Sequence, residues 1–134
     1  MGNVVAQVGE LLLPRACAGC RRPGALLCAS CRVGLAAPPQ RVFPNSGPHV
    51  PVFALGPYAD PHRSVVLAMK ERNHLAVRRY VGAVLASALE YLEARGDIPS
   101  GAVLVPAPTR ARSARARGGD PVEQVCRASG RPVA

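Results

Sequence analysis

The chain has 134 residues, and 17 Lys and Arg against 8 Asp and Glu give it a formal net charge of +9. This length allows one ordinary domain or a small module with part of a second, and 49% hydrophobic residues support a real core, which excludes global disorder. The wholly apolar stretches are too short for a membrane span, and the first residues lack the basic start of a signal peptide, so we predict a cytoplasmic protein.

The first predicted element is a short amphipathic helix over residues 4–13. Five aliphatic side chains recur there at helical spacing: Val4, Val5, Val8, Leu11 and Leu12. Pro14 cannot continue the helix and therefore ends it. We expect the apolar face of this helix to pack on the rest of the chain.

Four of the five cysteines follow in the pattern C-x2-C-x7-C-x2-C: Cys17, Cys20, Cys28 and Cys31. Each pair places two sulfur atoms on one side of a tight turn, and four thiolates complete the tetrahedral shell of a zinc ion with no open position. The spacing therefore predicts one structural zinc ion, which a short segment with little core needs for stability. Two disulfides, or an iron site with four cysteine ligands, are the alternatives. Cys126 is predicted to be a small buried side chain.

A proline-rich segment separates the cysteines from the remaining elements. Residues 38–61 hold seven of the 14 prolines and predict a linker that ends in one strand, at residues 51–58. A helix then starts with Asp60 as its cap and Pro61 in its first turn, and it continues to Asn73.

The next predicted helix is longer and amphipathic. Aliphatic residues recur from Val77 to Leu92, and Gly96 ends the helix. Four charged residues are placed on its opposite, polar side: Arg78, Arg79, Glu90 and Glu93.

The last third of the chain predicts a strand, a loop, a helix and the start of another strand. Residues 102–105 form a compact apolar run that is typical of a buried parallel strand. Residues 120–129 predict a helix capped by Asp120 and ended by Gly130, and residues 131–134 begin a strand. This order is an α/β alternation. We divide the chain into a helix and zinc module (1–37), a Pro-rich linker (38–50) and an incomplete α/β domain (51–134).

The net positive charge is unevenly distributed. Sixteen of the 17 basic residues are arginine, and the net charge is +4 in residues 1–47, +1 in residues 48–100 and +4 in residues 101–134. Such blocks suggest phosphate, nucleic acid or an acidic partner, although a solvated basic surface has the same pattern. Aromatic residues make up only 4% of the chain, which leaves few platforms on which bases could stack.

The chain resembles the ComF-type (GntX-like) proteins associated with competence in three blocks, which keep the order and spacing of that family: LLLPRACAGCRRPG with LCASCRVGL, VFALGPYADPHRSVVLAMKER, and VLVPAPTRARSARARGGDPVEQVCRA. Those proteins join an amino-terminal four-Cys zinc element to a type I phosphoribosyltransferase domain. The resemblance implies a zinc-ribbon-like knuckle followed by a partial Rossmann-like domain. It also implies phosphoribosyl pyrophosphate (PRPP) as substrate and the competence or DNA-uptake machinery as partner.

The resemblance assigns the pyrophosphate of PRPP to the loop after the 102–105 strand. The candidate residues of this loop are Pro106, Ala107, Pro108, Thr109 and Arg110. Its prolines stiffen the turn, and its remaining amides can donate to phosphate oxygens at the carboxyl end of a parallel strand. A Pro-x-Pro after a strand is also a common way to leave a sheet.

Four arginines continue from this loop in an R-x-R-x2-R-x-R run: Arg110, Arg112, Arg115 and Arg117. On a helix they would form no single stripe, so the run predicts a mobile arm that closes on a polyanion, or else a solvated loop. The family usually has Arg-Gly-Phe-Asn-Gln where this chain has Arg117, Gly118, Gly119, Asp120 and Pro121, so only the Arg-Gly matches.

Lys70 lies where the family has a lysine at a helix end. Its ammonium group could reach a phosphate, or it could simply suit the negative end of the helix dipole.

One element that defines type I phosphoribosyltransferases is missing. It is a pair of adjacent acids before a Thr- and Gly-rich loop, and this sequence has no two adjacent acidic residues. The family implies an enzyme, but we expect these 134 residues alone to be truncated before the PRPP loop and inactive in transfer.

Three functions of different classes follow from the sequence. The first is a ComF-type phosphoribosyltransferase-like protein with a structural zinc module. The second is a zinc-stabilised adaptor that binds nucleic acid or protein without catalysis. The third is a redox or iron protein that uses the four cysteines.

Overall fold

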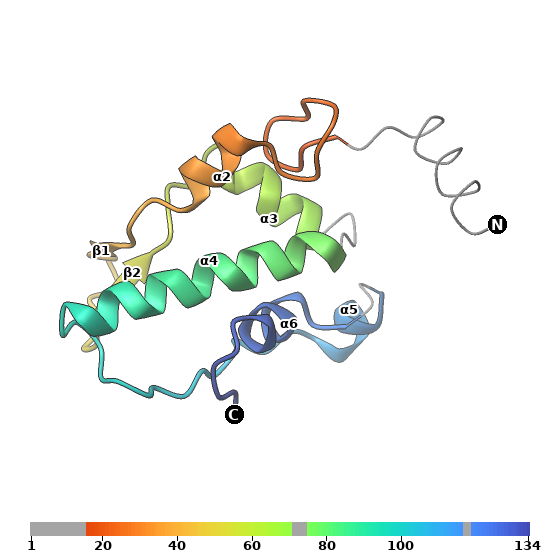
Figure 1. The fold of residues 1–134 in the computed structure, drawn as a ribbon. Helices are drawn as coiled ribbons and strands as arrows, with labels where there is room; N and C mark the ends of the chain where they lie inside the picture. The colour runs from red at the N-terminus through yellow and green to blue at the C-terminus, as the bar shows by residue number, and fades with distance from the viewer. Residues whose placement is uncertain (1–15, 71–74, 117–118) are drawn as a thin grey trace.

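The computed structural model describes residues 16–70, 75–116 and 119–134 (Figure 1). The helix predicted over residues 4–13, and Arg117 of the candidate phosphate ligands, lie outside the described residues. The described elements are, in chain order, α2 (Ala29–Leu35), β1 (Gln40–Val42), β2 (Val52–Ala54), α3 (His62–Lys70), α4 (Leu75–Ala94), α5 (Ala111–Ala116) and α6 (Pro121–Ala128). None of these helices is both long and apolar enough to span a membrane.

The long helix α4 lies at the centre of the fold. It packs against α3 on one side and α6 on the other (Figure 1). It ends where the sequence predicts, because Gly96 adopts a φ of 76°, which glycine tolerates without strain. The N–H of Asp97 donates to the Leu92 carbonyl at 2.9 Å and that of Gly96 to the Glu93 carbonyl at 3.0 Å. These two bonds form a Schellman motif.

A second glycine in α4 allows α6 to approach closely. A Cβ added at Gly82 would lie 2.5 Å from the Ala128 Cβ atom and 3.1 Å from the Val125 carbonyl oxygen. No larger residue fits there unless α6 shifts. The two helices therefore pack closely because Gly82 has no side chain.

Helix α6 begins as predicted. The Asp120 carboxylate accepts hydrogen bonds from the backbone N–H groups of Val122 at 2.9 Å and Glu123 at 3.3 Å, and Pro121 is the first helical residue. This is an N-cap, because the side chain satisfies amides that have no partner inside the helix. Gly130 has a φ of 76° just after the helix, which confirms the predicted end.

Arg78 corrects a prediction, because it is buried and not on the polar side of α4. Its side chain is 2% exposed. Its Nε and Nη2 atoms donate to the Met69 carbonyl oxygen at 3.2 and 3.0 Å, and Nη1 donates to Gln124 Oε1 at 2.6 Å. The last carbonyls of α3 have no partner inside their own helix, and the guanidinium supplies one. Arg78 therefore joins α3, α4 and α6.

The predicted linker contains a strand that the sequence did not reveal. Residues 40–42 form β1, which pairs antiparallel with β2, and β2 covers only the first half of the predicted strand at 51–58. The register is Gln40 opposite Ala54, Arg41 opposite Phe53 and Val42 opposite Val52. Prolines bound this hairpin, and a three-residue strand between them has no periodicity that could be recognised.

Residues 102–105 were predicted to form a buried parallel strand. They make one parallel bridge, but they are not buried and do not form a full strand. Leu104 forms a parallel bridge with Val133, as the Leu104 N–H donates to the Pro132 carbonyl at 2.8 Å and the Ala134 N–H to the Leu104 carbonyl at 2.9 Å. However, Val103 is 56% and Val105 77% exposed. Within the described residues no second layer covers these two side chains. The fold is thus mixed α/β, with one two-stranded sheet and this single parallel bridge among the described residues.

The main core connects the cysteine segment with the helices. Its buried members include Cys17 and Cys31, Leu27, Val65 and Met69 of α3, and Val77 of α4. We call residues 16–31 the knuckle. The knuckle is part of the same apolar cluster as α3 and α4.

Candidate metal centre and phosphate loop

The four predicted ligands meet in one cluster. The Sγ atoms of Cys17, Cys20, Cys28 and Cys31 all lie within 4.8 Å of one another. The Cys20 and Cys28 sulfur atoms, from different pairs, are 3.6 Å apart. A tetrahedral zinc site with bonds of about 2.3 Å has sulfur–sulfur edges of roughly 3.8 Å, which is close to this spacing. All five cysteines of the chain are free thiols.

The first cysteine pair is shaped by an unusual backbone turn. The N–H of Cys17 donates to the Arg22 carbonyl and that of Arg21 to the Cys17 carbonyl, both at 2.8 Å. Arg21 adopts a φ of 65°, a left-handed conformation that is uncommon for a non-glycine residue. This turn directs Cys17 inward and leaves Cys20 exposed. No pattern in the sequence indicated that Arg21, and not a glycine, takes this left-handed conformation.

Gly19 is required by the closeness of the two pairs. A Cβ added there would lie 2.7 Å from the Cys31 Sγ atom and 2.9 Å from the Pro61 Cβ atom. The second pair begins just before α2, since Cys28 is the N-cap residue and Cys31 lies in the first turn. Pro61, at the start of α3, therefore packs directly against the cluster.

Backbone amides stabilise negative charge on one sulfur atom. The N–H groups of Cys28 and Gly19 donate to the Cys17 sulfur at 3.3 and 3.4 Å. Burial alone would raise the pKa of Cys17, but these amides, with that of Cys20, lower it to about 6. The backbone N–H of Cys31 lowers the pKa of Cys28, whereas burial, with hydrogen bonds to the other thiols, raises the pKa of Cys31. Metal binding must therefore displace a proton from Cys31.

These residues fit a metal ion. Four sulfur donors from two short turns form a closed set that favours zinc, or an iron ion, and leaves no position for a substrate. Cys17 and Cys31 are buried, so the centre contacts the core. A metal held by these residues would supply structural stability and no catalytic chemistry.

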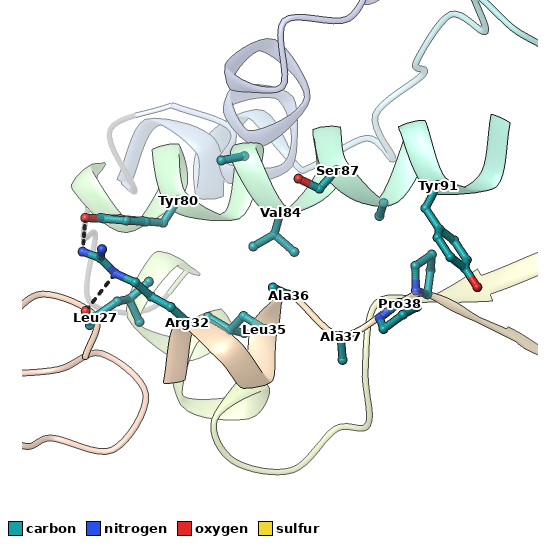
Figure 2. Close-up of a pocket in the computed structure, with 13 residues that line it drawn as sticks. Leu27, Arg32, Leu35, Ala36, Ala37, Pro38, Tyr80, Val84, Ser87 and Tyr91 are labelled. Carbon is teal, nitrogen blue, oxygen red and sulfur yellow. Dashed lines mark hydrogen bonds between the residues drawn. The ribbon is translucent and has the colours of Figure 1, made fainter. Parts of the chain in front are cut away.

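Arg32 fastens the knuckle to α4. Its Nε atom donates to the Leu27 carbonyl at 3.1 Å and its Nη2 atom to the Tyr80 hydroxyl at 2.6 Å (Figure 2). The guanidinium carbon also lies 4.9 Å from the centre of the Tyr80 ring. The donors of Arg32 are thus directed to Leu27 and Tyr80.

The candidate phosphate loop, Pro106 to Arg110, follows the Leu104 bridge. Ala107, Pro108 and Arg110 are exposed, whereas Pro106 and Thr109 are half-buried. The loop is thus accessible, and it follows a single parallel bridge, not a full strand of a sheet.

An acidic group already contacts this loop. Burial raises the pKa of Asp120, but hydrogen bonds from the Thr109 hydroxyl and backbone, together with the cap amides of Val122 and Glu123, lower it below its ordinary value. The Asp120 carboxylate therefore occupies the Thr109 amide, one of the three expected to bind phosphate. Asp120 was predicted as a helix cap, and its second contact was not predicted.

The arginines after the loop correct another prediction. Residues 111–116 form the short helix α5, whereas the sequence predicted a mobile arm or a solvated loop. Arg112 and Arg115 are exposed on α5, and the Arg110 carbonyl accepts the Ala114 N–H at 3.0 Å at its start. Small alanines at 111, 114 and 116 favour this helical turn.

Lys70, the only lysine of the chain and the remaining phosphate candidate, makes no contact with the loop that the structure records among the described residues. Lys70 is the last residue of α3 and half-buried. No hydrogen bond or ion pair joins it to the Pro106–Arg110 loop among residues 16–70, 75–116 and 119–134. The Met69 carbonyl beside it is held by Arg78, which also binds Gln124 of α6. This link between the end of α3 and α6 had no signal in the sequence.

Comparisons of this chain with protein-family models, with curated proteins and with solved structures each find no match.

Proposed function

We propose that this chain is a ComF-type phosphoribosyltransferase-like protein, with one structural zinc ion in its knuckle and a pyrophosphate-binding loop at Pro106 to Arg110. The observation that carries the proposal is the four-cysteine cluster, which lies inside the first block of the resemblance. The chain after the knuckle supports it in part, because the third block contains a single parallel bridge between Leu104 and Val133, an exposed loop and the helices α5 and α6.

The zinc ion has a structural role in this proposal. It would hold Cys17, Cys20, Cys28 and Cys31 in a closed shell. The knuckle then presents Leu27 to the helices, and Arg32 follows directly after the knuckle in α2. The cluster shares its core with α3 and α4, so the metal stabilises more than its own loops.

The loop would bind the leaving group of PRPP. In transfer from PRPP, pyrophosphate departs with two phosphates' worth of negative charge, and positioned amides and cations stabilise that charge. Ala107 and Arg110 offer exposed backbone N–H groups, and Arg110 adds a guanidinium. The acids and Thr-Gly loop for the ribose and 5'-phosphate do not occur in the sequence, so we expect pyrophosphate to bind without transfer.

The test is binding of inorganic pyrophosphate to the zinc-loaded chain by isothermal titration calorimetry at low salt. Arg110→Ala should weaken binding several-fold, whereas Arg63→Ala, at another exposed arginine, should not. We expect PRPP to bind no more tightly than pyrophosphate. No binding by the wild-type chain, or equal losses in the two variants, would contradict the loop assignment; one tightly bound zinc per chain would still support the metal site.

A nucleic-acid adaptor is the second candidate, favoured by the pattern of ion pairs. Arg95, Arg127 and Arg131 are paired with acids in α4, α6 and the turn after α4. In contrast, Arg112 and Arg115 on α5 are exposed and have no acidic partner among the described residues. They could neutralise phosphates along a strand.

The two candidates differ in their salt dependence and in their ligands. An adaptor requires binding to single- or double-stranded DNA that falls steeply with salt and weakens in the double variant Arg112→Ala, Arg115→Ala. No DNA binding at low salt would remove this candidate. Metal analysis of protein purified without added metal decides between zinc and iron, since an iron–thiolate centre is coloured and a zinc site is not.

A further inference from the structure

A groove runs along α4 beneath the knuckle and α2. It consists of two hollows of about 380 and 660 Å³ that share Arg32, Tyr80 and Ala83 in their walls. One hollow lies under Gly24 and Ala25 of the knuckle, and the other continues to Tyr91. The groove thus follows α4 from Ala76 to Tyr91, which is about 22 Å along a helix.

The walls of this groove are mainly apolar. Leu27, Leu35 and Val84 face the hollow drawn in Figure 2, and Tyr80 and Tyr91 stand towards the two ends of that hollow. None of the described residues in its walls is acidic. An occupant with an aliphatic face suits this surface, because it would remove apolar area of both partners from water.

The chain itself enters beside the groove. Ala16 forms an antiparallel bridge with Pro23, the residue before the groove-lining Gly24. The segment before Ala16 therefore starts next to the wider hollow. Residues 13–15 can span at most about 10 Å, and a helix over residues 4–12 would be about 13 Å long, which is shorter than the groove.

We propose that this groove is the docking site of the amphipathic segment at residues 4–13 of the same chain. The segment carries one aliphatic stripe and needs a partner for it: Val4, Val5, Val8, Leu11 and Leu12. Leu11 and Leu12 enter first, near Gly24 and Ala83, and the valines lie farther along, towards Val84 and Tyr91. The opposite face, with Ala6 and Glu10, remains in water.

A single tryptophan tests this proposal, because the chain has none of its own. Val8→Trp places the reporter on the aliphatic stripe, and Ala6→Trp is the matched control on the opposite face of the same helix. We expect blue-shifted emission from Val8→Trp and water-like emission from Ala6→Trp, in the zinc-loaded full chain. Both variants should keep the wild-type circular dichroism and metal content, since neither residue is in the described core.

A second pair of variants locates the contact. Ala83→Arg puts a guanidinium into the groove, and Ala94→Arg makes the same change at an exposed position of α4 outside it. Added to Val8→Trp, Ala83→Arg should shift the emission to that of exposed tryptophan, and Ala94→Arg should leave it blue-shifted. Equal emission from Val8→Trp and Ala6→Trp, or insensitivity to Ala83→Arg, overturns the proposal. Emission that depends on protein concentration also overturns it, because the occupant is then a second copy.

Discussion

The knuckle and the Pro106–Arg110 loop are both short turns that offer groups to a ligand, yet they differ in how complete they are. The knuckle brings four sulfur atoms within 4.8 Å and buries two of them. The loop is mostly exposed, and one of its amides binds the Asp120 carboxylate. Side chains at fixed spacing can form a complete ligand set within one short segment. Backbone amides form a binding site only when the surrounding segments leave them free to donate to a ligand.

The strongest way to test this difference is to remove the metal centre. Cys31→Ser, or a strong chelator, should unfold the knuckle and cost on the order of 10 kcal/mol of metal-linked stability. We expect α3 and α4 to lose cooperativity as well, because Cys17 and Cys31 share their core. Thermal unfolding followed by circular dichroism with and without zinc measures this effect.

Cys126→Ser is the matched control for that variant. Cys126 is buried in α6, outside the cluster, and burial raises the pKa of its thiol. The Cys126→Ser variant should keep one zinc per chain by metal analysis, even if the substitution lowers the melting temperature. Zinc content that falls equally in both serine variants would contradict the assignment of the four ligands.

The second test concerns Arg78, the buried residue that joins α3, α4 and α6. Arg78→Met leaves the Met69 carbonyl and Gln124 without their buried donor, and we expect a loss of about 2–4 kcal/mol in urea unfolding. Arg79→Met changes the exposed neighbour in the same way and should alter stability by less than about 0.5 kcal/mol. Similar values for the two variants would show that the buried network contributes nothing.

Acidification should affect the knuckle by releasing its metal. Zinc binds thiolates, and the pKa of Cys31 is raised, so this thiol is protonated in the metal-free protein between pH 8 and pH 6. Zinc binding must therefore displace at least one proton in this range of pH. The apparent zinc affinity should therefore fall by at least about tenfold per pH unit. Cys17, with a pKa of about 6, is mostly ionised above that pH and adds to the dependence only below it. Competition with a chromophoric chelator measures the slope, and a flat profile would contradict it.

The smallest expected effect is a change in pyrophosphate affinity at the Pro106–Arg110 loop. Asp120→Asn keeps an N-cap side chain but removes the negative charge beside Thr109, and it introduces the residue that the resembling family has there. Pyrophosphate affinity should rise at least about fivefold, which corresponds to roughly 1 kcal/mol of relieved repulsion. Asp97→Asn removes a carboxylate paired with Arg95 at the end of α4 and should leave the affinity unchanged. An unchanged affinity in Asp120→Asn would show that this carboxylate does not compete with a ligand.

Features set by neighbouring residues could be predicted from the sequence. The cysteine spacing, the Asp120 cap and the helix ends at Gly96 and Gly130 are of this kind, because each depends on a few consecutive residues. Thiol chemistry and backbone conformation fix them before the chain packs. The same holds for the long α4 helix, whose aliphatic pattern repeats over many turns.

Features set by distant segments could not be predicted. Arg78 is buried because Gln124, 46 residues later, and the end of α3 supply its acceptors. The pairing of β1 depends on a strand ten residues away across several prolines. Whether Val103 and Val105 are buried depends on what covers the strand, and no property of the run itself determines this.

The bond between Arg32 and Tyr80 gives the metal centre an optical reporter. Arg32 is the residue after Cys31, so any rearrangement of the second cysteine pair moves the guanidinium that binds the Tyr80 hydroxyl. The chain has no tryptophan and three tyrosines, of which Tyr58 is 70% and Tyr91 38% exposed. The near-ultraviolet circular dichroism of zinc-loaded protein should therefore come mainly from Tyr80. Its loss during a chelator titration would follow the state of the knuckle without any added label.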